Sequence, residues 1–320
     1  MPSLRPPRPR RQRGPRIVVV GDLVVDVVLA PDRALELGSD VPGRVMLVQG
    51  GSAATTARWL GRLGARASLV CAVGRDAAGR ALLDVLRADR VTPRVVRVTG
   101  ARTGRIGVLV GIDGERSFVQ DRAAALQLRP TDLRSGWFAG ADAVHVPTYS
   151  LLGEPLGLAG RRAIDLGRAA GAIVSADLSS IGPLMAGGRR SARALMEAVA
   201  PDILFATASE AEAFLGRYRP DGLLEVAPIA VIKRGSKGAT VLTRGAGGEP
   251  PLRFEVATRQ VAATDTTGAG DAFTAGFLVG WFAARAAGRP PAAALQRAAL
   301  AGHRAAARQL TTPRVDLALG

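Results

Sequence analysis

The chain has 320 residues, which is enough for one large α/β domain or two small ones with a sizeable core. With 48% hydrophobic and 22% charged residues, it has the composition of a folded protein, and a largely disordered chain is excluded. A single cysteine, Cys71, excludes a disulfide framework and a multi-cysteine zinc site, while two distant histidines, His145 and His303, argue against a histidine-rich metal centre.

The net charge of +16 raises the question of a nucleic-acid surface. Arginine supplies nearly all of it, because Lys233 and Lys237 are the only lysines, and six arginines fall within the first sixteen residues. Aromatic residues make up only 4%, which leaves little material for stacking on bases. We therefore expect no nucleic-acid partner, although an arginine-rich nucleic-acid binder stays open as an alternative reading.

The most apolar run, 272–284, is shorter than the 18 or so apolar residues that a membrane span needs. We therefore expect a cytoplasmic protein with no membrane partner. Residues 1–15 combine prolines with like charges and lack the apolar segment of a secretory signal. They are predicted to form a disordered basic tail, followed by one folded domain over 16–320.

From Arg16 onward, short apolar runs alternate with alanine- and leucine-rich segments of helical spacing. The runs predict buried strands at 17–20, 67–73, 143–146, 172–177, 203–205 and 230–232. The segments between them predict helices at 53–63, 78–88, 156–170 and 191–198. This alternation predicts an α/β fold with a mainly parallel central sheet flanked by helices.

Two segments interrupt the alternation. Residues 41–48 have strand character with no helix before them, and 105–120 hold two apolar runs around Asp113-Gly114, a typical hairpin turn. We expect a small antiparallel sheet, formed from about 32–50 and 102–122, that acts as a lid over a pocket. Decorative surface hairpins are the alternative, and an exposed lid sheet could also pair with its copy in a homodimer.

The most informative stretch is 263–273, where polar and glycine-rich residues lead directly into an apolar helix. Gly268, Ala269 and Gly270 have little or no side chain, so the backbone N–H groups of the first helical turn can approach an anion. Beside a bound phosphate, Asp271 would be placed to accept a proton from an attacking hydroxyl. The alternative is that Asp271 simply caps a core helix whose glycines allow close packing.

Two further glycine turns accompany this stretch. Gly50-Gly51 opens the first long helix, and Gly235-Ser236-Lys237-Gly238 follows a buried strand that ends in Lys233 and Arg234. The second turn places cations where a polyphosphate could lie. The pattern of a P-loop is absent, and no G-x-G-x-x-G follows the first strand, which argues against dinucleotide binding.

These motifs resemble a known family. Gly50-Gly51, with the helix through Arg62-Leu63-Gly64, is similar to the first signature of the PfkB/ribokinase family of carbohydrate and nucleoside kinases. Residues 265–273 are similar to its second signature. The other motifs fall in the family's order: Gly21-Asp22 with Asp26, Val73-Gly74-Arg75-Asp76 with Gly79, Asp177, and 235–239. The resemblance covers nearly the whole chain from residue 17 and implies a ribokinase-like fold with a small β lid.

The resemblance also implies roles. Asp271 would be the general base, and the amides of Gly268, Ala269 and Gly270 would form an anion hole for the transferred γ-phosphoryl group. The acceptor would be held by Asp26, Gly50, Gly51 and Thr55. ATP would lie along Lys233, Gly235, Ser236, Gly238, Thr266 and His303, although His303 has a simple helix-surface position as its alternative. Glu210 would orient water on Mg²⁺.

The chain departs from the family at three places. Thr55 and Thr207 stand where the family usually has asparagine, and Arg122 begins a segment that lacks the usual glycine and asparagine. The leading hypothesis is an ATP- and Mg²⁺-dependent kinase for a hydroxyl of a sugar or sugar derivative. A nucleoside kinase, and a degenerate member that binds without turnover, remain alternatives. Trp59 and Phe118 are the few aromatic candidates near the lid, and their scarcity favours a small polyol-like acceptor.

Overall fold

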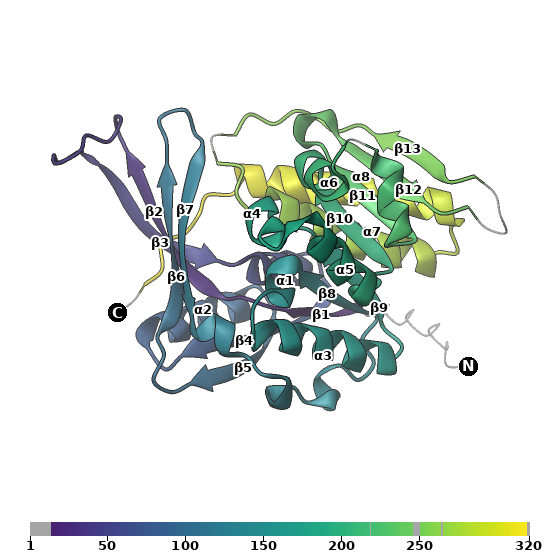
Figure 1. Cartoon of the computed structure of the whole chain (residues 1–320), viewed down its shortest axis with the longest axis horizontal. Helices are drawn as coiled ribbons and strands as arrows, with labels where there is room; N and C mark the ends of the chain where they lie inside the picture. The colour runs from purple at the N-terminus through teal and green to yellow at the C-terminus, as the bar shows by residue number, and fades with distance from the viewer. Residues whose placement is uncertain (1–13, 218, 246–249, 264, 319–320) are drawn as a thin grey trace, which may run out of the picture.

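A computed structural model describes residues 14–217, 219–245, 250–263 and 265–318 (Figure 1). Nine strands form the main sheet, in the order β13-β12-β11-β10-β9-β8-β1-β4-β5. In chain order they are β1 (Arg16–Val20), β4 (Arg66–Gly74), β5 (Thr92–Val98), β8 (Ala143–Pro147), β9 (Ile173–Asp177), β10 (Ile203–Thr207), β11 (Ile229–Lys233), β12 (Ala239–Thr243) and β13 (Leu252–Val256).

The strand pairs from β11 to β5 are parallel, and β12 and β13 add an antiparallel edge. This confirms the predicted mainly parallel sheet and all six predicted strands. The antiparallel edge was not predicted. Strand β12 follows β11 through the short turn at 234–238, without the crossover helix that a parallel neighbour requires.

Helices cover both faces of this sheet. The α-helices are α1 (Ser52–Arg62), α2 (Ala77–Ala88), α3 (Leu156–Ala169), α4 (Ile181–Met185), α5 (Gly188–Val199), α6 (Ala208–Leu215), α7 (Ala269–Ala286) and α8 (Pro291–Thr311). The 3₁₀ turns are η1 (Ala124–Gln127), η2 (Pro130–Asp132), η3 (Ser135–Trp137), η4 (Thr148–Leu151), η5 (Pro220–Glu225) and η6 (Gly235–Lys237).

Strand β1 shows why the sheet is buried on both sides. Ile17 and Val19 pack into a core with α1, α2, α7 and α8, whereas Val18 and Val20 pack into a second core with α3, α5 and α6. All four side chains are fully buried. Side chains alternate between the faces of a strand, so a continuous apolar run is what a doubly covered parallel sheet requires.

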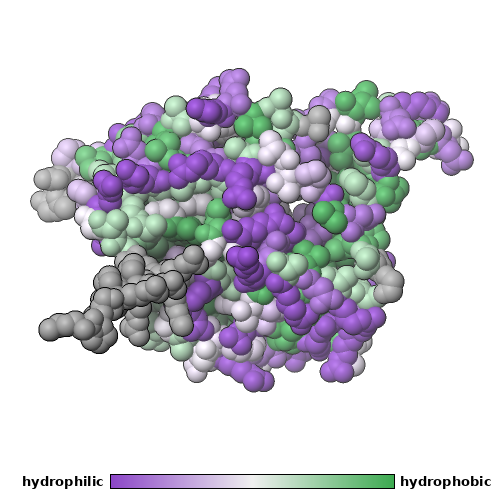
Figure 2. Space-filling view, turned by 180° about the vertical axis from the view of Figure 1, so that it is seen from behind, coloured by the Kyte–Doolittle hydropathy of each residue, from purple (hydrophilic) through white to green (hydrophobic). Residues whose placement is uncertain are grey.

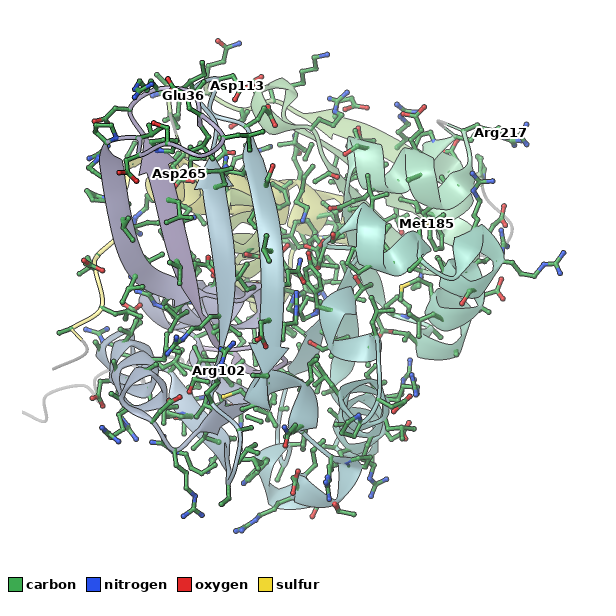
Figure 3. All side chains as sticks on the ribbon, turned by 60° about the vertical axis from the view of Figure 1, so that its left-hand side comes forward. Glu36, Arg102, Asp113, Met185, Arg217 and Asp265 are labelled. Carbon is green, nitrogen blue, oxygen red and sulfur yellow. The ribbon has the colours of Figure 1, made fainter. Side chains whose placement is uncertain are left out.

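The small sheet has the order β3-β2-β6-β7 and comprises β2 (Val24–Pro31), β3 (Gly43–Gly50), β6 (Thr103–Val110) and β7 (Arg116–Ala123). Figure 3 shows its strands side by side, with Glu36 and Asp113 at the free end and Arg102 at the end that joins the body. The predicted hairpin is confirmed, but the sheet is mixed, because β2 and β6 run parallel. Strand β2 was missed, and it extends the lid toward the N-terminus.

The outer face of the lid sheet is partly apolar. Leu29 on β2 lies opposite Val45 on β3, and both side chains are exposed, as is that of Val119 on β7. Such a face suits the predicted pairing of two lids. The homodimer itself stays a prediction.

Most of the predicted basic tail lies outside the described residues. At its described end, the N–H of Arg66 donates to the carbonyl oxygen of Pro15, so contacts with the body begin just before β1. Figure 2 shows hydrophilic residues spread over the face seen from behind, mixed with small apolar areas. Among the described residues, the helices are too short or too polar to cross a bilayer.

Candidate active site

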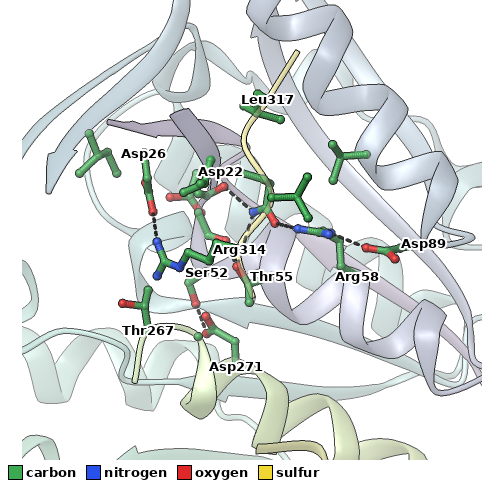
Figure 4. Close-up of a pocket in the computed structure, with 18 of the residues that line it drawn as sticks. Asp22, Asp26, Ser52, Thr55, Arg58, Asp89, Thr267, Asp271, Arg314 and Leu317 are labelled. Atoms are coloured by element: carbon green, nitrogen blue, oxygen red, sulfur yellow. Dashed lines mark hydrogen bonds and ion pairs between the residues drawn. The ribbon is translucent and has the colours of Figure 1, made fainter. Parts of the chain in front are cut away.

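A cavity of about 690 Å³ lies between the lid sheet and the N-termini of α1 and α7 (Figure 4). Six predicted site residues line it, from three separate parts of the chain: Asp26, Gly50, Gly51, Thr55, Gly268 and Asp271. The lid sheet brings the first two parts together because β2 begins at the cavity, antiparallel β3 ends there and α1 follows directly. The structure thus joins the predicted acceptor residues to the predicted base.

The N-terminus of α7 opens at this cavity. Gly268 precedes the helix with φ of 76°, a left-handed conformation that glycine adopts without strain, and no side chain caps the helix there. The N–H of Ala269 donates to the carbonyl oxygen of Thr266 within the turn. In the described structure no acceptor contacts the N–H groups of Gly270 and Asp271, so these two amides are free to bind an anion.

Asp271 lies at the floor of the cavity. Its Oδ1 accepts a hydrogen bond of 2.6 Å from the hydroxyl of Ser52, the first residue of α1. Burial raises the pKa of Asp271 to about 7, while the Ser52 hydrogen bond works in the opposite direction. A carboxyl group whose pKa lies near neutrality can take a proton and release it again, as a general base must.

Asp26 faces the cavity from β2. The residue is 7% exposed, and burial raises its pKa to about 7, although Arg314 lowers it. A Cβ atom on Gly50 would lie 1.8 Å from Oδ1 of Asp26, so only glycine fits at that position. The neighbouring Gly51 has φ of 97° and starts α1. The paired glycines therefore let α1 begin directly against two buried acids, Asp26 and Asp22.

Asp22 supports the wall beside Asp26. It is almost fully buried and accepts a hydrogen bond of 2.9 Å from Nη1 of Arg122, whose guanidinium lies 4.0 Å from the ring centre of Tyr149. This cation–π contact and ion pair form part of the cavity lining. The departure at Arg122 thus places a fixed positive group in the same cavity as the predicted acceptor residues.

The predicted nucleotide residues lie on the other side of the α7 N-terminus, outside the cavity lining. Nζ of Lys233 lies 2.5 Å from Asp177 and 3.4 Å from where a Cβ of Gly270 would be. Burial alone would lower the pKa of Lys233, but Asp177 and Glu210 raise it, so the amine stays charged. Asp177 also accepts a hydrogen bond from Thr274 in α7. This buried pair fixes a cation beside the free amides.

The turn at η6 and His303 adjoin the end of β13. A Cβ on Gly238 would lie 2.2 Å from the carbonyl oxygen of Val256, and Nε2 of His303 lies 3.1 Å from the same oxygen. The His303 ring also packs edge-on against Phe273. Gly238 and His303 thus both lie at the end of β13, and the contacts of His303 are those of a packed residue.

Glu210 forms a capping box at α6. Its Oε2 accepts the N–H of Thr207, and the hydroxyl of Thr207 accepts the N–H of Glu210. Thr207, which stands where the family usually has asparagine, therefore caps the N-terminus of α6. Within the described ranges, histidine, cysteine, aspartate and glutamate form no group of three that could hold a metal ion. Glu210 could contribute at most one ligand oxygen, with the rest from water and phosphate.

Sequence reasoning missed the residues that hold the Thr266–Gly268 turn. Arg116 on the lid donates to Thr266 Oγ1 at 2.6 Å, to Asp265 Oδ1 at 2.9 Å and to Thr267. The side chain of Gln309 in α8 donates to the carbonyl oxygen of Thr267 and accepts from Trp59. These partners come from distant segments, and no local spacing marks them.

Fold and site together define an α/β protein that can hold an anion at a helix N-terminus beside two carboxyl groups. This arrangement suits phosphoryl transfer to an alcohol. A family model described as pfkB family carbohydrate kinase matches residues 15–316. "Fructokinase" of Klebsiella pneumoniae is 32% identical over 282 residues, covering 83% of this chain and 84% of that protein. "Probable fructokinase-3" of Arabidopsis thaliana is 30% identical over 272 residues, covering 82% of this chain and 76% of that protein.

Solved structures share the fold. Adenosine kinase from Sinorhizobium meliloti has a TM-score of 0.79 at 24% identity and covers 96% of this chain and 97% of its own. An E. coli ribokinase II candidate in complex with ATP and Mg²⁺ has a TM-score of 0.77 at 22% identity, covering 94% of each chain. Vibrio cholerae fructokinase, bound to fructose, ADP and calcium, has a TM-score of 0.76 at 22%, also covering 94% of each.

The chain belongs to the pfkB carbohydrate kinase family. It is a phosphotransferase with an alcohol group as acceptor, and its fold is ribokinase-like, as the sequence predicts.

Proposed function

We propose that the chain transfers the γ-phosphoryl group of ATP to a hydroxyl of a small sugar, with a ketohexose such as fructose as the leading acceptor. One observation carries the proposal: Asp271, the open N-terminus of α7 and Asp26 share a single cavity. The fructokinase relatives support the choice of acceptor. A small-molecule sugar is thus the expected partner.

Asp271 acts as the general base. As the acceptor oxygen bonds to the γ-phosphorus, its proton passes to the free Oδ2 of Asp271, while Ser52 holds Oδ1. The bond between the γ-phosphorus and the bridging oxygen breaks, and ADP leaves with that oxygen. The intact geometry at Asp271 favours turnover over a degenerate, non-catalytic member.

The amides of Gly270 and Asp271, together with Lys233, bind the transferring phosphoryl group. They are fixed before the reaction, so charge that develops on the phosphoryl oxygens meets donors already in place. Loss of one such donor typically costs about 3 to 4 kcal/mol of transition-state stabilisation. Gly268 and Ala269 shape the turn that exposes these amides.

The residues present fit ATP and Mg²⁺. The η6 turn and Lys233 would lie along the phosphates, and Glu210 keeps one carboxylate oxygen free of the described hydrogen bonds for a water on the metal. Burial raises the pKa of Glu210, whereas a cation bound nearby would lower that pKa and favour the charged carboxylate. When bound, Mg²⁺ would neutralise charge on the β- and γ-phosphate oxygens.

A nucleoside kinase remains the second candidate, because the cavity is larger than a monosaccharide needs and Trp59 and Phe118 both line it. ADP release by the purified full chain should be measured with ATP, Mg²⁺ and a panel of fructose, other monosaccharides and nucleosides. We expect turnover with a monosaccharide, fructose first. Turnover with nucleosides alone would reassign the acceptor, and binding without ADP release would support the non-catalytic alternative.

A further inference from the structure

The C-terminal segment forms a wall of the acceptor cavity. After α8 ends at Thr311, residues 312–318 cross from the body to the lid sheet (Figure 1). The N–H of Leu317 donates to the carbonyl oxygen of Leu47 at 2.7 Å, and Asp316 accepts the N–H of Leu47 at 2.7 Å. Leu317 is 8% exposed and packs into the main core. The segment is therefore held at β3, the edge strand of the lid.

Between these anchors, Arg314 directs its guanidinium into the cavity (Figure 4). Its Nε lies 2.9 Å from Oδ2 of Asp265, and Nη1 lies 4.0 Å from Oδ2 of Asp26. Asp265 is itself fixed, because it accepts the N–H of Thr267 at 2.8 Å and a hydrogen bond from Arg116. One edge of the guanidinium is thus anchored, and the other faces Asp26.

The distance between Nη1 and Oδ2 of Asp26 is too long for a direct hydrogen bond, and a hydroxyl oxygen set to one side of this gap can lie within hydrogen-bond distance of both groups. A hydroxyl can donate to the carboxylate and accept from the guanidinium at the same time. Among the described residues, no side chain or backbone group donates a hydrogen bond to Asp26. A donor and an acceptor therefore face each other across an opening in the cavity wall.

We infer that Arg314 is a substrate-binding residue, which donates a hydrogen bond to the same acceptor hydroxyl whose hydrogen Asp26 accepts. This rests on the proposed sugar kinase function and deepens it, because the pair recognises a polyol hydroxyl other than the one that is phosphorylated. A nonpolar or hydroxyl-free group at this point would leave both charged groups without their hydrogen bonds.

The test is steady-state kinetics of the full chain with fructose and ATP, comparing wild type with Arg314→Gln, Arg314→Lys and the control Arg304→Gln. Arg304 is an exposed arginine on α8, outside the cavity, so its variant removes the same charge without touching the site. We expect Arg314→Gln to raise KM for fructose by about 10- to 100-fold, the range for a hydrogen bond to a charged group. KM for ATP and the control should change less than about twofold.

A merely structural role for Arg314, through Asp265, predicts a different result: kcat falls and the thermal unfolding midpoint drops while KM for fructose holds. That result overturns the inference, as does an unchanged KM in Arg314→Gln. Deoxyfructose analogues, each lacking one hydroxyl, give a second readout. The analogue that lacks the bridging hydroxyl should bind wild type and Arg314→Gln equally well, because the interaction is already lost.

Arg314→Lys guards against a folding defect, because it keeps the positive charge. The lysine amine cannot contact both Asp265 and the hydroxyl, so we expect a KM for fructose between those of wild type and Arg314→Gln. The two proposals fail in distinguishable ways. A wild type that neither binds nor phosphorylates any sugar contradicts the proposed function and this inference with it. Suppose instead that wild type phosphorylates fructose, and that removal of each hydroxyl weakens binding to wild type and to Arg314→Gln by the same factor. That result contradicts this inference alone.

Discussion

At the scale of single residues, the chemistry depends on how the protein sets the charge of Asp271. Burial holds its pKa near 7 instead of its usual 3.8, so the carboxyl group ionises as the pH rises through neutrality. The folded chain holds this proton more tightly than the unfolded chain. The contribution of Asp271 to stability is therefore fully present below about pH 4 and is lost as the pH rises to about 7.

The Ser52 hydrogen bond supports the ionised form of Asp271, so Ser52→Ala should raise the pKa of that carboxyl further. The expected result is that kcat/KM, which rises through about pH 7 in wild type, rises at a higher pH in the variant. Activity should be lower at pH 7 and largely restored in more alkaline buffer. The measurement is a pH–rate profile from pH 5.5 to 9, with Ser191→Ala on the exposed side of α5 as control.

Identical pH–rate profiles for wild type and Ser52→Ala would show that Ser52 does not influence the ionisation of the base. Sequence reasoning did not select Ser52, because its role depends on α1 and α7 meeting at their N-termini. Asp271 and the glycines before it were selected, because adjacent residues carry that signal.

At the scale of elements, the sequence predicts the alternation of strands and helices well, since apolar periodicity is local and the parallel strands are buried on both faces. It predicts the lid less completely. Strand β2 reads as part of one apolar run after β1, and only the three-dimensional break at Gly21 and Asp22 turns it into a separate sheet. The pairing of the 312–318 segment with β3 has no periodic signal at all.

The close approach of β3 to β2 gives an element-scale prediction at Gly50. A Cβ atom there would collide with the Asp26 carboxylate, so Gly50→Ala must displace the group that receives the acceptor hydroxyl. We expect KM for the sugar to rise about tenfold or more, with KM for ATP nearly unchanged. The check is steady-state kinetics in both substrates, beside Gly136→Ala, whose added methyl group meets nothing within 4 Å.

If Gly50→Ala keeps the wild-type KM for every accepted sugar, Asp26 is not part of the acceptor site. A loss of folding is detected separately, because the thermal unfolding midpoint of the variant is measured on the same sample.

At the scale of the whole molecule, the lid is joined to the body at the turn before α7, where we propose that phosphoryl transfer takes place. Arg116 at the start of β7 spans from the lid to Asp265 and Thr266, and residues 312–318 tie β3 to α8. Both connections converge on Asp265, just before the free amides of α7. The lid sheet and the turn that precedes α7 are therefore joined by direct contacts, so we expect a change in the lid to be felt at that turn.

Arg116→Gln should loosen this link. With the lid less firmly held over the cavity, kcat should fall and KM for the sugar should rise together, each by about tenfold, as is typical when closure is impaired. Hydrogen–deuterium exchange over β6 and β7 should become faster, with Arg44→Gln, an exposed lid arginine, as the control. Unchanged exchange and kinetics in Arg116→Gln would contradict the coupling.

The most direct test of the account is ADP release by Asp271→Asn with ATP, Mg²⁺ and the acceptor that wild type prefers. Asparagine keeps an oxygen for the Ser52 hydroxyl but cannot take the proton from the acceptor. The account predicts a loss of kcat of about 100-fold or more, with binding of a non-hydrolysable ATP analogue retained. Turnover at the wild-type rate by this variant would contradict the assignment of Asp271 as the base and the mechanism built on it.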